Sequence, residues 1–177
     1  MQTPEYWYYP GSQDSTGEHM QVQLRRAYIQ QLNQLEPLVA AYHAFEDIHS
    51  SADERSSALR QLLQDENLGA LWLIEVDSQI AGYIALCRGF SIEFNGFDAF
   101  VDEFFLLPEF RGRGIGKRAL GDIEDAARNL GINALHLEVA RDNLPARRLY
   151  ASAGFAARDK YTLMSLNLQA DTGASKA

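Results

Sequence analysis

The sequence predicts one α/β domain, in which β-strands and amphipathic helices share a single core. With 177 residues, 46% hydrophobic content and 11% aromatic residues, the chain can build one substantial core but is short for two domains. Apolar residues repeat with a period of two in some segments and near 3.6 in others, which indicates strands and helices. A glycine-rich loop at residues 108–117 joins one predicted strand to one predicted helix. We expect an N-terminal extension over residues 1–20, the domain over 21–169 and a polar tail over 170–177.

The first half of the chain predicts a strand, two helices and a β-hairpin. Alternating residues indicate the strand over 22–28, and apolar residues at helical spacing indicate helices over 30–46 and 53–64. Residues 71–76 and 80–90 are rich in β-forming residues and are joined by a short polar turn, which is typical of a hairpin.

The second half predicts strands and helices in alternation. The expected elements are a strand over 98–107, a helix over 115–130 that stops at Gly131, a strand over 135–139, a helix that begins near Asn143 and ends at Gly154-Phe155, and a last alternating strand over 161–168. Pro145 falls in the first turn of the last helix, where proline is tolerated.

Charge and cysteine content narrow the class of protein. A net charge of −8 and a pI of about 4.9 disfavour nonspecific nucleic-acid binding and weakly favour a cationic partner. The one cysteine, Cys87, cannot form an internal disulfide, and its place in a predicted strand indicates a small buried apolar residue. No leader or membrane-spanning apolar run is evident, so we expect a cytoplasmic protein without a membrane partner.

The glycine loop has the chemistry of a phosphate site. Glycines at alternate positions leave backbone N–H groups unshielded, and a helix N-terminus adds unpaired donors and partial positive charge. A nucleotide-triphosphatase P-loop is excluded because Arg111 and Arg118 stand where that motif needs Gly and Ser or Thr. A dinucleotide fingerprint is weak because it needs a glycine where the chain has Lys117.

Two motifs resemble the GNAT superfamily of N-acetyltransferases. Arg-Gly-Arg-Gly-Ile-Gly at 111–116, after a strand that ends in Pro108, is similar to that family's acetyl-CoA pyrophosphate loop. Asn143, Ala146, Tyr150 and Gly154-Phe155 have the spacing of its second conserved block. With their flanking strands, the two blocks cover roughly residues 99–166. The resemblance implies a mixed, mostly antiparallel sheet with helices on both faces, splayed where acetyl-CoA enters.

The resemblance also implies site residues. Tyr150 is similar to the family's general acid, which protonates the departing thiolate; the alternative is an ordinary core tyrosine on an apolar helix face. The residues that would hold acetyl-CoA are Phe104, Phe105 and Leu106 at the strand end, Arg111, Gly112, Arg113, Gly114, Ile115 and Gly116 in the loop, and Asn143 at the next helix start. No metal is expected.

Acetyl transfer to an amine needs a base that removes the proton of the ammonium form, and we expect that base near the strand end. An alkylammonium with a pKa of about 10.4 is neutral in roughly one molecule in 2,500 at pH 7, which corresponds to about 4.6 kcal/mol. A carboxylate, directly or through water, is the expected helper. Asp102 and Glu103 are adjacent, so on a regular strand only one can face the site unless a bulge intervenes. Asp102 matches the base position of spermidine/spermine-type relatives and is slightly favoured, while Glu103 has the longer reach.

The expected function is direct transfer of an acetyl group from acetyl-CoA to a primary amine in a ternary complex. A small amine is slightly favoured over a protein lysine. Two alternatives stay open: a non-catalytic acyl-CoA-binding sensor, and a transferase that uses a longer acyl-CoA. A homodimer is plausible for the family. A polar and aromatic cluster between the first two helices either lines an acceptor pocket or is a solvated loop: His43, Phe45, Glu46, Asp47 and His49.

Overall fold

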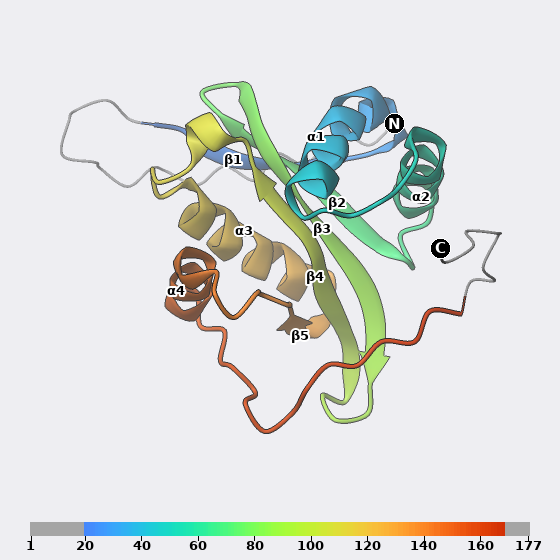
Figure 1. Cartoon of the computed structure of the whole chain (residues 1–177), viewed down its shortest axis with the longest axis vertical. Helices are drawn as coiled ribbons and strands as arrows, with labels where there is room; N and C mark the ends of the chain where they lie inside the picture. Colours follow the sequence, from blue (N-terminus) through green and yellow to red (C-terminus); the bar gives the residue numbers. More distant parts are fainter. Residues whose placement is uncertain (1–19, 169–177) are drawn as a thin grey trace, which may run out of the picture.

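The computed structural model describes residues 20–168, so most of the expected N-terminal extension and all of the expected tail lie outside the described residues. The elements are β1 (Val22–Ala27), α1 (Leu32–Phe45), α2 (Ala52–Gln64), β2 (Gly69–Val76), β3 (Gln79–Ser91), β4 (Gly96–Leu106), α3 (Ile115–Asn129), β5 (Ile132–His136) and α4 (Leu144–Ser152) (Figure 1). One short 3-10 helix, Ile29–Gln31, precedes α1, and another, Pro108–Phe110, forms the start of the glycine loop. Between residues 20 and 168, no helix combines the length and apolarity needed to cross a lipid bilayer.

The strands form one five-stranded sheet in the order β1-β2-β3-β4-β5. The first three pairings are antiparallel, and β5 joins β4 in parallel. Helices α1 and α2 cover one face of the sheet, while α3 packs on the other face with α4 beside it (Figure 1). The predicted fold class is confirmed: an α/β domain with a mixed, mostly antiparallel sheet and helices on both faces.

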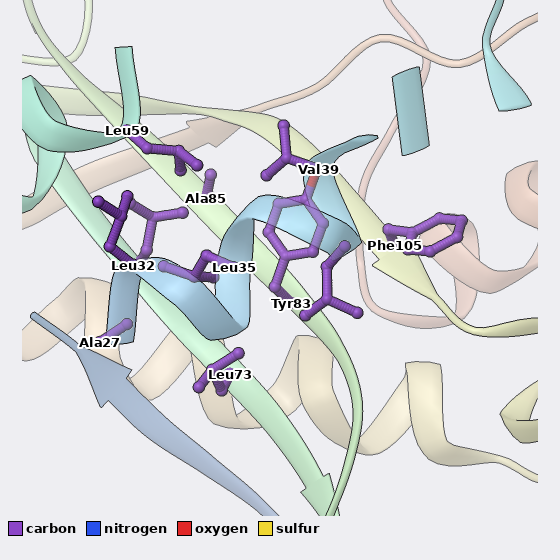
Figure 2. Packing of buried hydrophobic residues seen from close by; sticks show 11 residues of the cluster. Ala27, Leu32, Leu35, Val39, Leu59, Leu73, Tyr83, Ala85 and Phe105 are labelled. Carbon is purple, nitrogen blue, oxygen red and sulfur yellow. The ribbon is translucent and has the colours of Figure 1, made fainter. Parts of the chain in front are cut away.

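The core under α1 fixes how that helix sits on the sheet. Leu35 of α1 and Leu73 of β2 are fully buried, and so is Tyr83 of β3 (Figure 2). Burying a side chain of this size contributes about 1.5–3 kcal/mol, so this cluster holds α1 firmly against β2, β3 and β4. Phe105 of β4 closes the cluster at the end nearest the glycine loop.

Two predicted strands in the second half differ from the structure. The strand expected over 135–139 lies three residues earlier, at Ile132–His136, because Ile132 is the buried anchor and β4 has no pairing residue for the chain after His136. The last strand expected over 161–168 does not form. Its apolar side chains stay exposed, with Met164 at 88%, because the segment pairs with no strand of the described sheet.

Candidate active site

The sheet opens into a cleft where β4 and β5 diverge. The two strands pair only between Phe97 and Phe100 of β4, and within the described residues β4 has no partner on that side from Val101 onward. A cleft of about 1670 Å³ fills the gap, with the end of β4 as one wall and residues 137–141 and α4 as the other. The free strand edge offers backbone N–H and C=O groups to a ligand that lies along it.

The cleft brings together most of the residues that the sequence singled out. Those lining it are Asp102, Phe104, Phe105, Leu106, Arg111, Gly112, Gly114, Gly116, Asn143 and Tyr150. Three others do not line it. Ile115, the first residue of α3, is fully buried, the Arg113 guanidinium lies 5.9 Å from the Phe110 ring centre, and Glu103 lies on the α1 side of β4.

The glycine loop bounds one end of the cleft. Gly112 and Gly114 have φ of +73° and +79°, a backbone region that L-residues rarely adopt, and a Cβ on either would meet no atom within 4 Å. Gly114 is the N-cap of α3, so N–H groups of the first helical turn have no partner inside the helix. The result is an open cradle of donors at a helix N-terminus, which suits a phosphate or pyrophosphate.

Arg111 links this loop to the aromatic wall of the cleft. Its Nε donates to the carbonyl oxygen of Leu106 at 2.8 Å, and its guanidinium lies 4.8 Å from the Phe45 ring centre and 5.3 Å from that of Phe105. Its charged head is therefore held by cation–π contacts and a backbone carbonyl. The phosphate contact expected of Arg111 stays a prediction.

Helix α4 supplies the opposite wall. Asn143 is its N-cap, with Oδ1 accepting from the Ala146 N–H at 3.2 Å, which explains an asparagine at this helix start. One turn on, Tyr150 packs between the Phe104 ring at 6.5 Å and the Phe155 ring at 5.9 Å. Its hydroxyl donates to no described residue. Burial, and to a lesser degree the charge of Glu46, raises the pKa of Tyr150, so the hydroxyl keeps its proton.

A β-bulge decides where the two adjacent carboxylates lie. Ala85 of β3 pairs with Glu103 and Leu86 pairs with Val101, so Asp102 is the extra residue of β4. Without the bulge, neighbouring side chains would alternate faces. With it, Glu103 joins Tyr83 on the α1 face, and Asp102 approaches Cys87 of β3 on the same face. The sequence allowed both carboxylates to lie on one face only if a bulge intervened, and the structure has that bulge.

The two carboxylates have different environments. Asp102 is exposed and lines the cleft, whereas both oxygens of Glu103 are taken. Glu103 Oε1 lies 2.7 Å from His43 Nε2 of α1, and Oε2 accepts from the Tyr83 hydroxyl. Burial, and then the Glu103 charge, raises the pKa of Tyr83 well above its usual range. Of the two carboxylates, Asp102 is the one that is open to the cleft, with the Cys87 thiol as its neighbour.

Cys87 is a weak nucleophile at neutral pH. Burial, followed by the charge of Asp102 and its hydrogen bond, raises the pKa of the Cys87 thiol to about 12. Because the thiolate is the reactive form of cysteine, Cys87 stays inert at neutral pH. Within residues 20–168, no three or more His, Cys, Asp or Glu side chains gather in a group that could hold a metal ion.

A family model decides the relationship. The model of the "Acetyltransferase (GNAT) family" matches residues 33–155, which span α1 to the end of α4. The chain belongs to the GNAT family. It is therefore an acyltransferase, and the cleft described above is the candidate active site of a GNAT enzyme.

Known proteins resemble the chain over different lengths. It is 42% identical over 62 residues to "Uncharacterized N-acetyltransferase YycN" of Bacillus subtilis strain 168, a match to 35% of this chain and 40% of that relative. An integron cassette protein, HFX_CASS3, from the mobile metagenome of Cole Harbour Salt Marsh is 32% identical, with a TM-score of 0.73 over 82% of this chain and 90% of that one. The aminoglycoside N-acetyltransferase AAC(6')-Iy, solved in complex with CoA, shares the fold at 15% identity, with a TM-score of 0.70 over 85% of this chain and 98% of that one.

Sequence reasoning left the partners of Glu103 undetected. His43 was named as one member of a cluster that either lines a pocket or is solvated, and its contact with Glu103, 60 residues away, has no local sequence signal. Tyr83 was read as one residue of a strand. The sequence gives no signal that pairs Glu103 with His43 or with Tyr83, because the three residues lie on separate elements that meet only in the folded sheet.

Proposed function

We propose that this GNAT enzyme transfers an acetyl group from acetyl-CoA to a primary amine of a small molecule. The observation that carries the proposal is the free edge of β4, which has the glycine cradle at one end, Tyr150 on one side and Asp102 on the other. Acetyl-CoA supplies the acetyl group as a thioester. The shape and donor set of the cleft suit that cosubstrate, because the empty space beside Gly112 and Gly114 lets an anion approach the backbone.

The residues divide into a donor half and an acceptor half. In the donor half, backbone groups of Phe104, Phe105 and Leu106 bind the pantetheine arm like an added strand, and the cradle binds the pyrophosphate. Asn143 positions this wall by capping α4. Tyr150 holds a proton at its hydroxyl for the departing sulfur, which its raised pKa supports.

Asp102 is the residue that meets the amine. Its exposed carboxylate attracts the ammonium form and accepts its proton, directly or through one water, so that a neutral amine attacks. Glu46 also lines this end of the cleft, with the aromatic rings of Tyr42 and Phe45 beside it. Carboxylates and aromatic faces together favour a cationic acceptor.

Thiol release from acetyl-CoA, measured with purified protein, tests the proposal. The acceptor panel contains polyamines, amino acids, aminoglycosides and lysine peptides, since one solved relative is an aminoglycoside N-acetyltransferase by name. Amine-dependent release is expected, and calorimetry should show acetyl-CoA binding without an amine. Acetyl-CoA binding with no turnover on any amine would favour a non-catalytic sensor. Faster thiol release from a longer acyl-CoA would show that the longer acyl-CoA, and not acetyl-CoA, is the preferred donor. No binding would contradict the proposal.

A further inference from the structure

A partly buried chain of hydrogen bonds lies behind Asp102, and none of its members lines the cleft. It runs from Ser50 through His43 to Glu103 and ends at Tyr83. Ser50 Oγ lies 2.6 Å from His43 Nδ1, and His43 Nε2 lies 2.7 Å from Glu103 Oε1. The side chains of His43 and Glu103 are only 14% and 17% exposed. The chain therefore joins the loop after α1 to the middle of the sheet.

Each end of this chain is anchored. Arg55 of α2 donates to both Oγ and the carbonyl oxygen of Ser50, which fixes the hydroxyl that faces His43. Tyr83 is fully buried in the core under α1. A carboxylate held between two such anchors has little freedom to rotate, and a half-buried carboxylate that lost its partner would pay a desolvation cost.

Glu103 is also the residue at which β4 resumes its pairing with β3. The extra residue Asp102 lies directly before it, between Val101 and Glu103. A bulged residue has no ladder partner of its own, so its direction depends on the residues that flank it. Val101 is buried on the α3 face of the sheet, and Glu103 is tied to the α1 face.

We propose that His43 is a positioning residue that acts through Glu103 to hold the bulge and aim Asp102 into the acceptor end of the cleft. The proposal rests on the proposed function for the identity of the acceptor site. It assigns His43 no contact with the substrate, since His43 does not line the cleft. It also assigns the Glu103 carboxylate an anchoring role in place of the base role that the sequence left open.

Kinetic variants separate positioning from general damage. Replacing His43 with Ala should raise the acceptor KM about tenfold, since the hydrogen bond that holds the Glu103 carboxylate is lost, while the acetyl-CoA Kd stays unchanged. His43→Gln should restore most of the loss, because its amide can occupy the place of Nε2 and donate to Glu103. His49→Gln is the matched control, since His49 is exposed in the same loop and lies outside the chain of hydrogen bonds.

A second readout needs no acceptor. Cys87 is the chain's single cysteine and faces Asp102, so its alkylation by iodoacetamide reports where that carboxylate lies. If His43 aims Asp102, His43→Ala should speed alkylation at pH 8.5 severalfold, because each unit by which the thiol pKa falls gives about ten times more thiolate. Asp102→Asn should also speed it, and adding His43→Ala to Asp102→Asn should add little, because Glu103 is the weaker of the two charges that act on the Cys87 thiol.

The outcomes are distinct. If Cys87 in His43→Ala is alkylated at the same rate as in the wild type, the inference is overturned, whether or not an amine substrate is known. Additive effects of His43→Ala and Asp102→Asn would overturn it too, because His43 would then act by another route. A failure of all amines in the turnover assay, together with non-additive alkylation, would contradict the proposed function and leave the positioning role supported. Thermal melting of each variant confirms that the comparison concerns folded protein.

Discussion

The proposed donor and acceptor halves of the cleft are built in different ways. The donor half uses a short span of chain, from the end of β4 through the glycine loop to α3, and α4. The acceptor half joins α1, β3 and β4 through side chains far apart in sequence, such as His43 and Glu103. The first half depends mostly on backbone groups, and the second mostly on side chains. Substitutions in the two halves should therefore change different kinetic constants.

The largest effect is expected at Tyr150. Tyr150→Phe should lower kcat by about 10² to 10⁴, the usual range for a lost proton donor, because the ring packing is kept and only the hydroxyl is removed. The acetyl-CoA Kd from calorimetry should not change. An unchanged kcat would remove Tyr150 from the mechanism and leave it a packing residue between Phe104 and Phe155.

The pH profile sharpens the same point. The raised pKa of Tyr150 means that its proton is retained as pH climbs past the ordinary tyrosine value. For an alkylamine acceptor, kcat/KM should therefore rise about tenfold per pH unit from 7 toward 10, as the free amine accumulates. A falling limb below pH 9 that disappears in Tyr150→Phe would show that Tyr150 titrates early, in the direction opposite to that expected.

The two carboxylates provide the test of the acceptor half. Asp102→Asn should lower kcat/KM for the amine about 10- to 100-fold, because a hydrogen bond to a charged group contributes about 1.5–3 kcal/mol. Glu103→Gln should cost only a few-fold, since a glutamine can accept from His43 and donate to Tyr83 in the same place. The reverse order of effects would make Glu103 the residue that meets the amine.

The glycine cradle gives a smaller effect, confined to the donor half. Gly114→Ala should weaken acetyl-CoA binding about 5- to 30-fold, because a left-handed backbone costs an L-residue about 1–2 kcal/mol and the loop relaxes away from its cradle geometry. The acceptor KM should stay constant. Gly121→Ala is the matched control, since Gly121 lies inside α3 with open space at its Cβ and no positive φ.

The smallest effect is expected away from both halves. Ser51 caps α2 in a reciprocal arrangement with Glu54: its hydroxyl accepts from the Glu54 N–H, and Glu54 accepts from the Ser51 N–H. Ser51→Ala should lower the free energy of unfolding by about 1 kcal/mol, measured in urea, with kcat unchanged. A clear fall in kcat in the folded Ser51→Ala variant would show that the loop after α1 is coupled to the site through Ser51 as well as Ser50.

The predictability of the two halves follows from the same difference in construction. The glycine loop and the α4 block could be located from the sequence because their residues lie at fixed short spacings, where local backbone geometry determines the contacts. The helices and the first four strands were predicted from their periodicity and are confirmed. The chain of hydrogen bonds at Glu103 could not be found, because it depends on how α1 packs against β3 and β4.

The strand errors have a related cause. Apolar residues alternate in 135–139 and 161–168, which is typical of strands. The alternation cannot show whether a neighbouring strand is there to pair with. Leu137 and Val139 line the cleft, and Arg158 forms an exposed ion pair with Glu93 at the turn between β3 and β4. Periodicity describes one strand, whereas a sheet requires two.

The bulge in β4 reverses which residues of the strand face each side of the sheet. Up to Val101, the odd-numbered residues of β4 face α3, and from Glu103 onward the odd-numbered residues face α1. Deleting Asp102 would leave one unbroken ladder with regular pairing, a gain by the measure of sheet regularity. That deletion would also remove the exposed carboxylate. The irregular pairing of β3 with β4 and the exposed carboxylate that lines the cleft therefore come from the same residue.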